Sequence, residues 1–177
     1  MIRLETDRLI LRNFTEKDIN DFYEYMSLES TARYEDFDPK TYEECIYSLK
    51  GRIPRDNIMA VILKESGKLI GDVHYSDKGE YETYEIGYHF NEKFWNNGYA
   101  TEACIAMLDY IFNELGGRRI YAECNEDNYS SIKLLERLGM RREGHFIEDV
   151  AFKKDSHGNP IYENGYSYAI LKKEWHL

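Results

Sequence analysis

The sequence predicts an α+β fold, in which a single domain spans residues 1–177 and a mixed, mostly antiparallel sheet holds about seven strands. The first observation is that three strand-like segments follow one another with only short turns between them, as antiparallel neighbours do. The second is a strand–helix–strand segment directly after them, which indicates a parallel pair with a right-handed crossover. The length of 177 residues, with 42% hydrophobic residues and 3 prolines, suits a single hydrophobic core.

The first half of the chain alternates strands with capped helices. Thr15 with Asp18, and Thr41 with Glu44, have the spacing of capping boxes, so each threonine is expected to begin a helix. The segment 30–40 between these helices is polar and aromatic, and loops in such positions often contact a substrate. The strands expected in this half lie at 9–12, 58–64, 69–75 and 82–90.

The second half begins with a long helix. We expect it to run from Gly98 to Leu115, because its apolar residues recur at helical spacing and Gly116 follows them. The remaining elements are a strand at 118–124, a helix from Asn128 to Gly139, and a hairpin with strands at 144–153 and 161–171.

Composition and charge exclude several classes of protein. The net charge of −10 argues against a nucleic-acid partner, and favours either a cationic substrate or solubility alone. No apolar run approaches the ~20 residues of a membrane span, and the first residues lack the apolar core of a signal peptide. Cys45, Cys104 and Cys124 are odd in number and far apart, so we expect reduced cysteines in a cytoplasmic protein.

The segment 94–103 is the strongest candidate for a binding site. Gly98 and Ala100 stand where strand periodicity changes to helix periodicity, and such small residues let a ligand approach the backbone. The first turn of a helix also carries free N–H groups and the positive end of the helix dipole. These properties predict a phosphate site, although a simple polar loop with Asn96 or Asn97 near the cap fits the same residues.

Three motifs, taken in order, resemble one family. They are the segment 6–12, the segment 85–88 followed by 95–103, and the segment 128–131 followed by 135–140. Together they span nearly the whole chain, which resembles the GNAT acyl-CoA N-acyltransferases. Within that family it is most similar to the bacterial ribosomal-protein N-terminal (alanine) acetyltransferases. One departure is Trp95, at a position where the wider family often has Gln or Arg, so backbone N–H groups are expected to bind most of the pyrophosphate.

The resemblance implies helices on both faces of the sheet and a split between the fourth and fifth strands. Acetyl-CoA would be the acyl donor, with its pantetheine arm in the split and its pyrophosphate at the segment 94–103. The resemblance also implies that relatives are often homodimers. The cofactor-binding residues that it implies are Ile86, Tyr88, Asn96, Asn97, Gly98, Ala100, Thr101, Asn128 and Ser131.

Two residues are candidates for catalysis. Acetylation by a thioester requires a neutral amine and a leaving thiolate that becomes protonated. We therefore expect Glu85 to be the general base and Ser131 to donate a proton to the leaving sulfur. Glu85 also fits a surface glutamate on a polar strand face, and Ser131 also fits a helix cap with Asn128. His74 and His89 are alternative bases. No motif for a metal ion is present.

The identity of the acceptor stays open at this point. The leading hypothesis is an acetyl-CoA-dependent N-acetyltransferase that acts on a primary amine, for which the resemblance suggests a protein N-terminus. A polyamine, an aminoglycoside-like antibiotic or a free amino acid would fit the same chemistry. A third hypothesis is an acyl-CoA-binding sensor without turnover, against which Glu85, Gly98 and Ser131 speak weakly.

Overall fold

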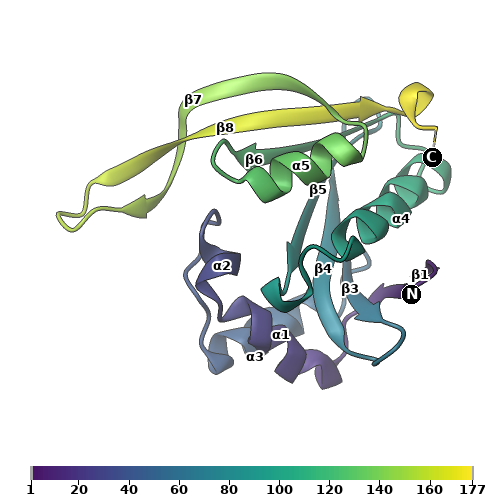
Figure 1. The fold of residues 1–177 in the computed structure, drawn as a ribbon, viewed down its shortest axis with the longest axis horizontal. Coiled ribbons are helices and arrows are strands. Elements are labelled where there is room, and N and C mark those ends of the chain that lie inside the picture. Colours follow the sequence, from purple (N-terminus) through teal and green to yellow (C-terminus); the bar gives the residue numbers. More distant parts are fainter. Residues whose placement is uncertain (1, 177) are drawn as a thin grey trace.

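The computed structural model describes residues 2–176 of the chain (Figure 1). Its helices are α1 (Ile19–Met26), α2 (Glu29–Ala32), α3 (Tyr42–Arg52), α4 (Tyr99–Asn113) and α5 (Tyr129–Arg137), with 3-10 turns at Glu16–Asp18, Glu92–Phe94 and Lys172–Glu174. Its strands are β1 (Arg3–Glu5), β2 (Leu9–Asn13), β3 (Ile58–Leu63), β4 (Leu69–Asp77), β5 (Thr83–Phe90), β6 (Arg119–Asn125), β7 (Arg141–Lys154) and β8 (Pro160–Leu171).

The strands form one mixed sheet in the order β1-β2-β3-β4-β5-β6-β8-β7. All neighbours are antiparallel except β5 and β6, which are parallel and joined through α4, so the predicted α+β fold is confirmed. The sheet has eight strands where about seven were expected. The additional strand is β1, whose Leu4 pairs with Leu11 of β2, and its 3 residues are too few to show an alternating pattern.

The predicted split in the sheet is present between β5 and β6. Their pairing covers only the first residues of β5 and ends at Glu85 with Tyr121, whereas β5 stays paired with β4 as far as Phe90 with Gly71. Beyond Glu85, the edge of β5 that faces β6 therefore has no strand partner. As a consequence, β6, β7 and β8 turn away from the plane of the other strands (Figure 1).

Helices cover both faces of the sheet, as expected. One core packs the sheet against α4 and α5, and a second packs it against α1 and α3. The alternation within β2 explains the division, since Leu9 and Leu11 belong to the first core while Ile10 packs against the second. Residues on both faces of these strands are therefore apolar.

The expected helix caps form at both early helices. The Thr41 N–H donates to the Glu44 carboxylate at 2.8 Å, and the Glu44 N–H donates to the Thr41 hydroxyl at 3.3 Å. The Asp18 carboxylate accepts from the Thr15 N–H at 2.7 Å, and a 3-10 turn there leads into α1. The segment 30–40 is not entirely loop, because its first residues belong to the short helix α2.

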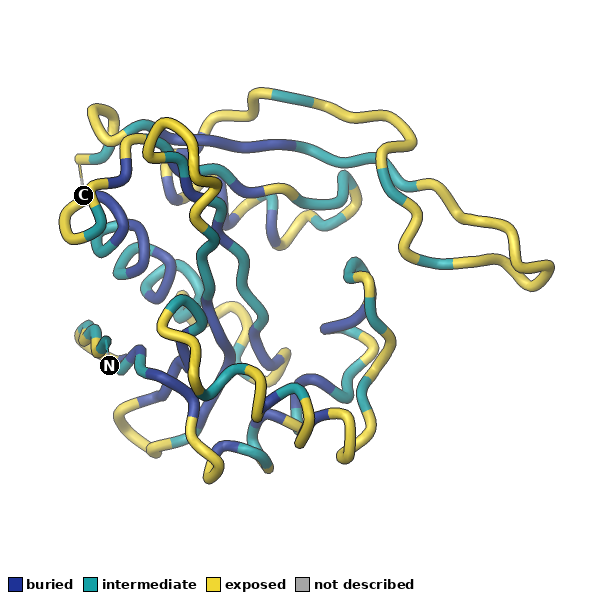
Figure 2. The backbone as a smooth tube through the Cα atoms, turned by 180° about the vertical axis from the view of Figure 1, so that it is seen from behind, coloured by how far each residue is buried: buried dark blue, intermediate teal, exposed yellow. Residues whose placement is uncertain are grey.

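The β7–β8 hairpin extends past the rest of the molecule, and its far end is largely exposed (Figures 1 and 2). It touches the segment after α2, where the Lys153 ammonium donates to the Phe37 carbonyl at 2.8 Å and pairs with Asp38 at 2.9 Å. Among residues 2–176, no helix is both long enough and apolar enough to cross a bilayer.

Candidate active site

A cleft of about 690 Å³ lies beside the unpaired end of β5. Its walls come from the end of β5, the N-terminal turns of α4 and α5, and the segment around α2. The predicted site residues that line it are Tyr88, Asn96, Gly98, Ala100, Thr101, Asn128 and Ser131. Glu85, Ile86 and Asn97 do not line it. The fold thus brings together most residues of two segments that were expected to bind one cofactor.

The loop before α4 has the backbone shape of an anion site. Asn96 and Gly98 have positive φ angles of 61° and 80°, and Gly98 is the N-cap of α4. Left-handed residues in such a turn help to direct successive N–H groups to one side, and the first turn of a helix leaves its N–H groups free. The side chains brace this shape, since Asn97 donates to the Trp95 carbonyl at 2.9 Å and the Trp95 indole donates to the Phe90 carbonyl at 2.9 Å.

Two arginines place positive charge around this loop. The Arg8 guanidinium donates to the Asn97 carbonyl at 3.0 Å and pairs with Glu102 at 2.7 Å. Arg137, which lines the cleft, donates to the Thr101 hydroxyl at 3.2 Å. Free backbone N–H groups next to guanidinium groups are the donors that phosphate oxygens prefer, so these residues fit a phosphorylated cofactor.

The start of α5 forms the opposite side of the cleft. The Asn128 side-chain oxygen accepts from the Ser131 N–H at 3.2 Å, so the capping role expected for Asn128 is present. The Ser131 hydroxyl lies 2.6 Å from the Tyr88 hydroxyl, which reaches across the split from β5. Burial raises the pKa of Tyr88 well above its usual value, and Ser131 offsets only part of that rise. Tyr88 therefore keeps its proton and has a hydrogen to donate.

Glu85 lies at the closed end of the split rather than in the cleft. It is the last residue of β5 that pairs with β6, and its carboxylate forms an ion pair with Lys78. The Ser76 hydroxyl donates to the same carboxylate at 3.3 Å. To act as a base, Glu85 would have to release Lys78 and take the proton of the acceptor amine, directly or through water. Its catalytic role stays a prediction.

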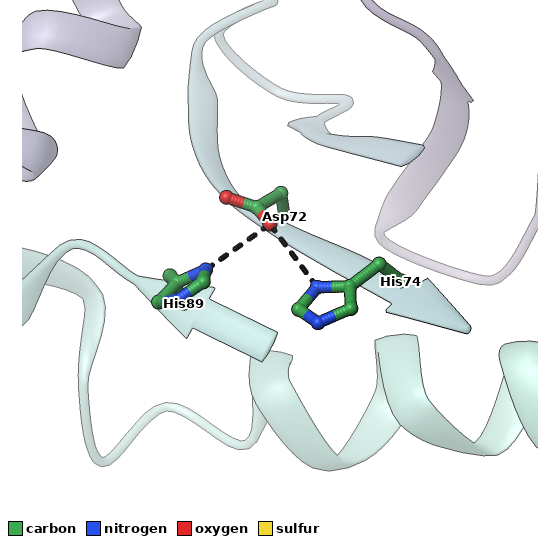
Figure 3. Close-up of side chains that lie close together, drawn as sticks. All are labelled: Asp72, His74 and His89. Atoms are coloured by element: carbon green, nitrogen blue, oxygen red, sulfur yellow. Dashed lines mark hydrogen bonds and ion pairs between the residues drawn. The ribbon is translucent and has the colours of Figure 1, made fainter. Parts of the chain in front are cut away.

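The two candidate histidines share one buried carboxylate on the other face of β5 (Figure 3). His89 Nδ1 lies 3.2 Å from Asp72 Oδ1, and His74 Nδ1 lies 3.7 Å from the same oxygen. Asp72 is fully buried and also accepts from the Tyr25 hydroxyl at 2.6 Å and from Arg52 at 3.2 Å.

Charge in this cluster decides what His89 can do. Burial raises the pKa of Asp72, but Arg52 and His89 hold it well below its usual value. Burial lowers the pKa of His89. The charge of Asp72, the hydrogen bond between Asp72 and His89, and the nearby Glu35 carboxylate outweigh this effect and raise the pKa of His89 to about 9. His89 is therefore an imidazolium at neutral pH, which favours a donor over a general base.

The same cluster has ligand spacing for a metal ion, which the sequence did not suggest. The ligand atoms of Asp72, His74 and His89 lie within 4.8 Å of one another. A metal ion there would face the Arg52 guanidinium on the same carboxylate oxygen and would have to displace the proton of His89. This donor set fits a buried ion cluster better than a metal centre.

Sequence reasoning missed several residues of the cleft, among them Arg137 of α5, Asp127 before α5 and a group in the segment 30–40. Tyr34 and Glu35 line the cleft, and the Tyr34 hydroxyl donates to the Asp127 carbonyl at 3.1 Å, which bridges this segment to the start of α5. Glu35 Oε1 lies 3.7 Å from His89 Nε2. The signal was the polar, aromatic composition of the segment between two helices, although it did not single out a residue.

Over nearly its whole length, the chain is similar to proteins that are named as acetyltransferases. Residues 8–141 match the family model described as an acetyltransferase (GNAT) domain. The uncharacterized N-acetyltransferase YnaD of Bacillus subtilis (strain 168) is 37% identical over 176 residues, which cover 98% of this chain and 99% of that protein. A GNAT-family acetyltransferase from Bacillus anthracis has a crystal structure that superposes with a TM-score of 0.89, at 34% identity, over 98% of this chain and 100% of that one.

A more distant solved structure shares the fold. Spermidine N-acetyltransferase from Vibrio cholerae, in complex with CoA and spermine, superposes with a TM-score of 0.78 at 21% identity, over 96% of this chain and 99% of that one. The phosphate-type loop, the split sheet and the match over residues 8–141 agree with one another. The chain therefore belongs to the GNAT family of acetyltransferases, and it is an N-acetyltransferase.

Proposed function

We propose that this enzyme transfers the acetyl group of acetyl-CoA to a primary amine, and that the leading acceptor is a protein N-terminus. The observation that carries the proposal is the cleft of about 690 Å³ at the unpaired edge of β5. It has the N-terminus of α4 at one side and the Ser131 hydroxyl at the other. Such a cleft offers donors to phosphate, a free strand edge to an amide-bearing chain, and a hydroxyl to sulfur.

The phosphate end of the proposal rests on backbone groups. The pyrophosphate would bind to the N–H groups of Gly98, Ala100 and Thr101, because the left-handed residues before α4 turn them toward the cleft. Arg137 would add a charged donor from α5. Asn97 would act indirectly, since its side chain is engaged by the carbonyl groups of its own loop.

The pantetheine arm would run along the unpaired edge of β5. Its amides would bond to the backbone near Ile86 and Tyr88, in the way that an added strand bonds to a sheet edge. Asn128 would take part from the opposite wall, because its side-chain oxygen caps α5 while its amide nitrogen makes no hydrogen bond in the described chain. Ser131 would then lie near the sulfur end of the arm.

The reaction on this proposal is a direct transfer. The amine nitrogen attacks the acetyl carbonyl carbon, a C–N bond forms, and the C–S bond breaks. The nitrogen gives a proton through water to Glu85, which lies outside the cleft lining, once that carboxylate has left Lys78. The departing sulfur takes a proton from the Ser131 hydroxyl. Tyr88 orients the Ser131 hydroxyl, because the two hydroxyl oxygens lie 2.6 Å apart, and Ser131 regains a proton from solvent after the transfer.

A polyamine is the second candidate acceptor. The observations that favour it are the net charge of −10 and the carboxylates of Glu35 and Asp127 at the cleft. The spermidine N-acetyltransferase with the same fold acts on a compound of this class by its name. An aminoglycoside, an amino acid and a sensor without turnover are the other outcomes of the test below.

A homodimer belongs to the same proposal. Several apolar side chains are exposed along the extended β7–β8 hairpin, and such side chains favour association. They are Phe146, Ile147, Phe152, Ile161 and Tyr162. Light scattering after gel filtration measures the mass, and a mass of 21.1 kDa at micromolar concentration would exclude the dimer.

The test has two measurements on the same protein. Isothermal titration with acetyl-CoA measures binding, and a free-thiol assay measures turnover over a panel of amines. We expect acetyl-CoA to bind and an N-terminal peptide to release thiol faster than spermidine, an aminoglycoside or a free amino acid. Faster thiol release with one of those compounds would identify that compound's class as the acceptor. Binding without turnover on any amine would indicate a sensor, and absence of binding would reject the proposal.

A further inference from the structure

The two faces of β5 have different surroundings, and this separates two halves of the cleft. Tyr88 points toward α4 and α5, while His89, the next residue, points toward the face covered by α1 and α3. His89 and Glu35 both line the cleft on that second side. The cofactor residues proposed above lie on the first side, so the second side is free for the acceptor.

His89 is held as an oriented donor. Its side chain is only 10% exposed, and Nδ1 is engaged by Asp72, whose other partners are Tyr25 and Arg52. Its remaining nitrogen, Nε2, is directed toward Glu35 at 3.7 Å, which is longer than a hydrogen bond. The cluster behind it fixes the ring, and so Nε2–H keeps its capacity to donate to a ligand (Figure 3).

Glu35 is the complementary acceptor. Its side chain is 39% exposed, and its carboxylate accepts no hydrogen bond within the described part of the chain. Arg52 and the His89 imidazolium carry two positive charges, and Asp72 carries one negative charge. The carboxylate of Glu35 supplies the second negative charge that balances the cluster. A ligand that places a cation on Glu35 must therefore also offer negative or electron-rich oxygen to His89.

We propose that Glu35 and His89 form the acceptor site, and that it takes a primary amine with a carbonyl or carboxylate oxygen on the adjacent carbon. This inference rests on the proposed N-acetyltransferase function and narrows its acceptor class. The ammonium group binds Glu35, and the neighbouring oxygen accepts a hydrogen bond from His89 Nε2. In such compounds the nitrogen and oxygen lie roughly 3 Å apart by standard bond lengths. This spacing suits the Glu35 carboxylate and His89 Nε2, which lie 3.7 Å from each other.

The proposed site discriminates among the acceptors left open above. Protein N-termini, amino acid amides and free amino acids carry the required oxygen, whereas polyamines and lysine side chains do not. A polyamine would place a second cation or a methylene group against the buried imidazolium of His89, which leaves that donor unpaired.

The test compares acceptors with and without the carboxamide group that carries this oxygen. Thiol release is measured with alaninamide, with a peptide that begins with alanine, and with isopropylamine, which replaces the carboxamide by a methyl group. In the parent enzyme, we expect kcat/KM for alaninamide to exceed that for isopropylamine by tenfold or more. His89→Gln should abolish that preference mainly through KM for alaninamide. Glu35→Gln should raise KM for both amines.

Two controls separate possible failures. Asp36→Asn removes a carboxylate from the same segment, outside the cleft lining, and should leave both amines unchanged. Acetyl-CoA binding by titration shows whether His89→Gln is folded, and Glu35→Gln tests the site by itself if it is not.

Equal rates for alaninamide and isopropylamine, or a parent that prefers spermidine, would overturn this inference while leaving the N-acetyltransferase function intact. No thiol release with any amine would instead reject the proposed function.

Discussion

At the scale of single residues, the hydroxyl groups of Tyr88 and Ser131 form the short polar contact across the split. A hydroxyl group donates one hydrogen and accepts through two lone pairs. If Tyr88 donates to Ser131, the Ser131 hydrogen is free to point at another atom, and the cleft is the direction in which a thioester sulfur would lie. Tyr88 is thus a positioning residue for Ser131, whereas the family resemblance implied only that Tyr88 binds the cofactor.

The first prediction separates these two roles. Ser131→Ala should lower kcat while acetyl-CoA still binds, if the hydroxyl group meets sulfur mainly in the transition state. Tyr88→Phe should lower kcat by a smaller factor, up to about tenfold, because it removes one hydrogen bond of about 1 kcal/mol. Steady-state kinetics and titration with acetyl-CoA measure both effects. Full turnover in Ser131→Ala with a lower Tm would show that the hydroxyl group only supports the helix start.

The second prediction concerns Glu85. If it is the base, Glu85→Gln should lower the rate at neutral pH by roughly 10²- to 10⁴-fold, with acetyl-CoA binding nearly unchanged. The deficit should shrink at high pH, where the amine loses its proton to solvent. Lys78→Met is the matched control, because it removes the partner of Glu85 and keeps the carboxylate. Its rate should not fall.

A pH–rate profile distinguishes a base from an acceptor anchor. Loss of the acidic limb in Glu85→Gln supports the base. If both profiles have the same shape and differ only in KM for the amine, and if added salt reproduces that difference in the parent, Glu85 attracts the acceptor instead.

At the scale of elements, the start of α4 depends on one backbone conformation. Gly98 has a φ of 80°, and a Cβ there would meet only the Arg8 guanidinium, at 3.4 Å. Space is therefore available for a side chain, and the cost of any substitution comes from the left-handed conformation, about 1–2 kcal/mol for an L-residue.

The third prediction uses this distinction. Gly98→Ala should lower stability by about 1–2 kcal/mol and weaken acetyl-CoA binding moderately. Gly98→Glu adds a carboxylate against the pyrophosphate and should weaken binding by a further tenfold or more, roughly 1.4 kcal/mol. Gly79→Ala, at a turn with a φ of 73° and no atom near the added Cβ, is the control for strain alone. If a folded Gly98→Glu variant binds acetyl-CoA with unchanged affinity, the cofactor does not bind at this loop.

The strands also constrain each other through small residues. A Cβ at Gly87 would lie 2.3 Å from His74 Nε2, and a Cβ at Gly71 would lie 2.4 Å from the His89 carbonyl oxygen. Both distances are below van der Waals contact, so these glycines let β4 and β5 carry two histidines close together. This packing places His89 where the cleft begins.

At the scale of the whole molecule, the buried cluster around Asp72 links stability to pH. Groups from five parts of the fold face one another there: Asp72 and His74 from β4, His89 from β5, Glu35 after α2, Arg52 from α3, and Tyr25 from α1. The pKa of Asp72 is lowered on folding, so its contribution to stability is present at neutral pH and is lost in acid. His89 acts in the opposite direction.

The fourth prediction is an alkaline loss of stability. The pKa of His89 rises from 6.5 to about 9 on folding, so its contribution is complete below pH 6.5 and disappears as the pH rises through 9. That contribution is on the order of 3 kcal/mol. Urea unfolding at several pH values should show this decline in the parent and a flatter curve in His89→Gln. His157→Gln, in the exposed hairpin turn, is the control, and parallel curves for parent and His89→Gln would contradict the prediction.

Much of the fold could be predicted because its signals are local. The caps at Thr15 and Thr41 and the glycine at position 98 each specify backbone geometry within a few residues, and all three elements begin where expected. The strand β1 was missed because 3 residues carry no pattern, and its strand geometry comes from pairing with β2. The helix α2 was missed for a similar reason, since 4 residues are too few to show helical periodicity.

The two cofactor-type segments, the family resemblance and the pattern of buried faces can be read from the amino-acid order, because each of these depends on neighbours along the chain. Which side chains meet depends on the folded arrangement. Tyr88 and Ser131 are 43 positions apart, and Glu35 reaches His89 of β5 from a segment that precedes α3, β3 and β4. Such contacts depend on strand register and on the point where β5 and β6 separate. Those are set by the packing of the two cores, for which a single sequence carries no local signal.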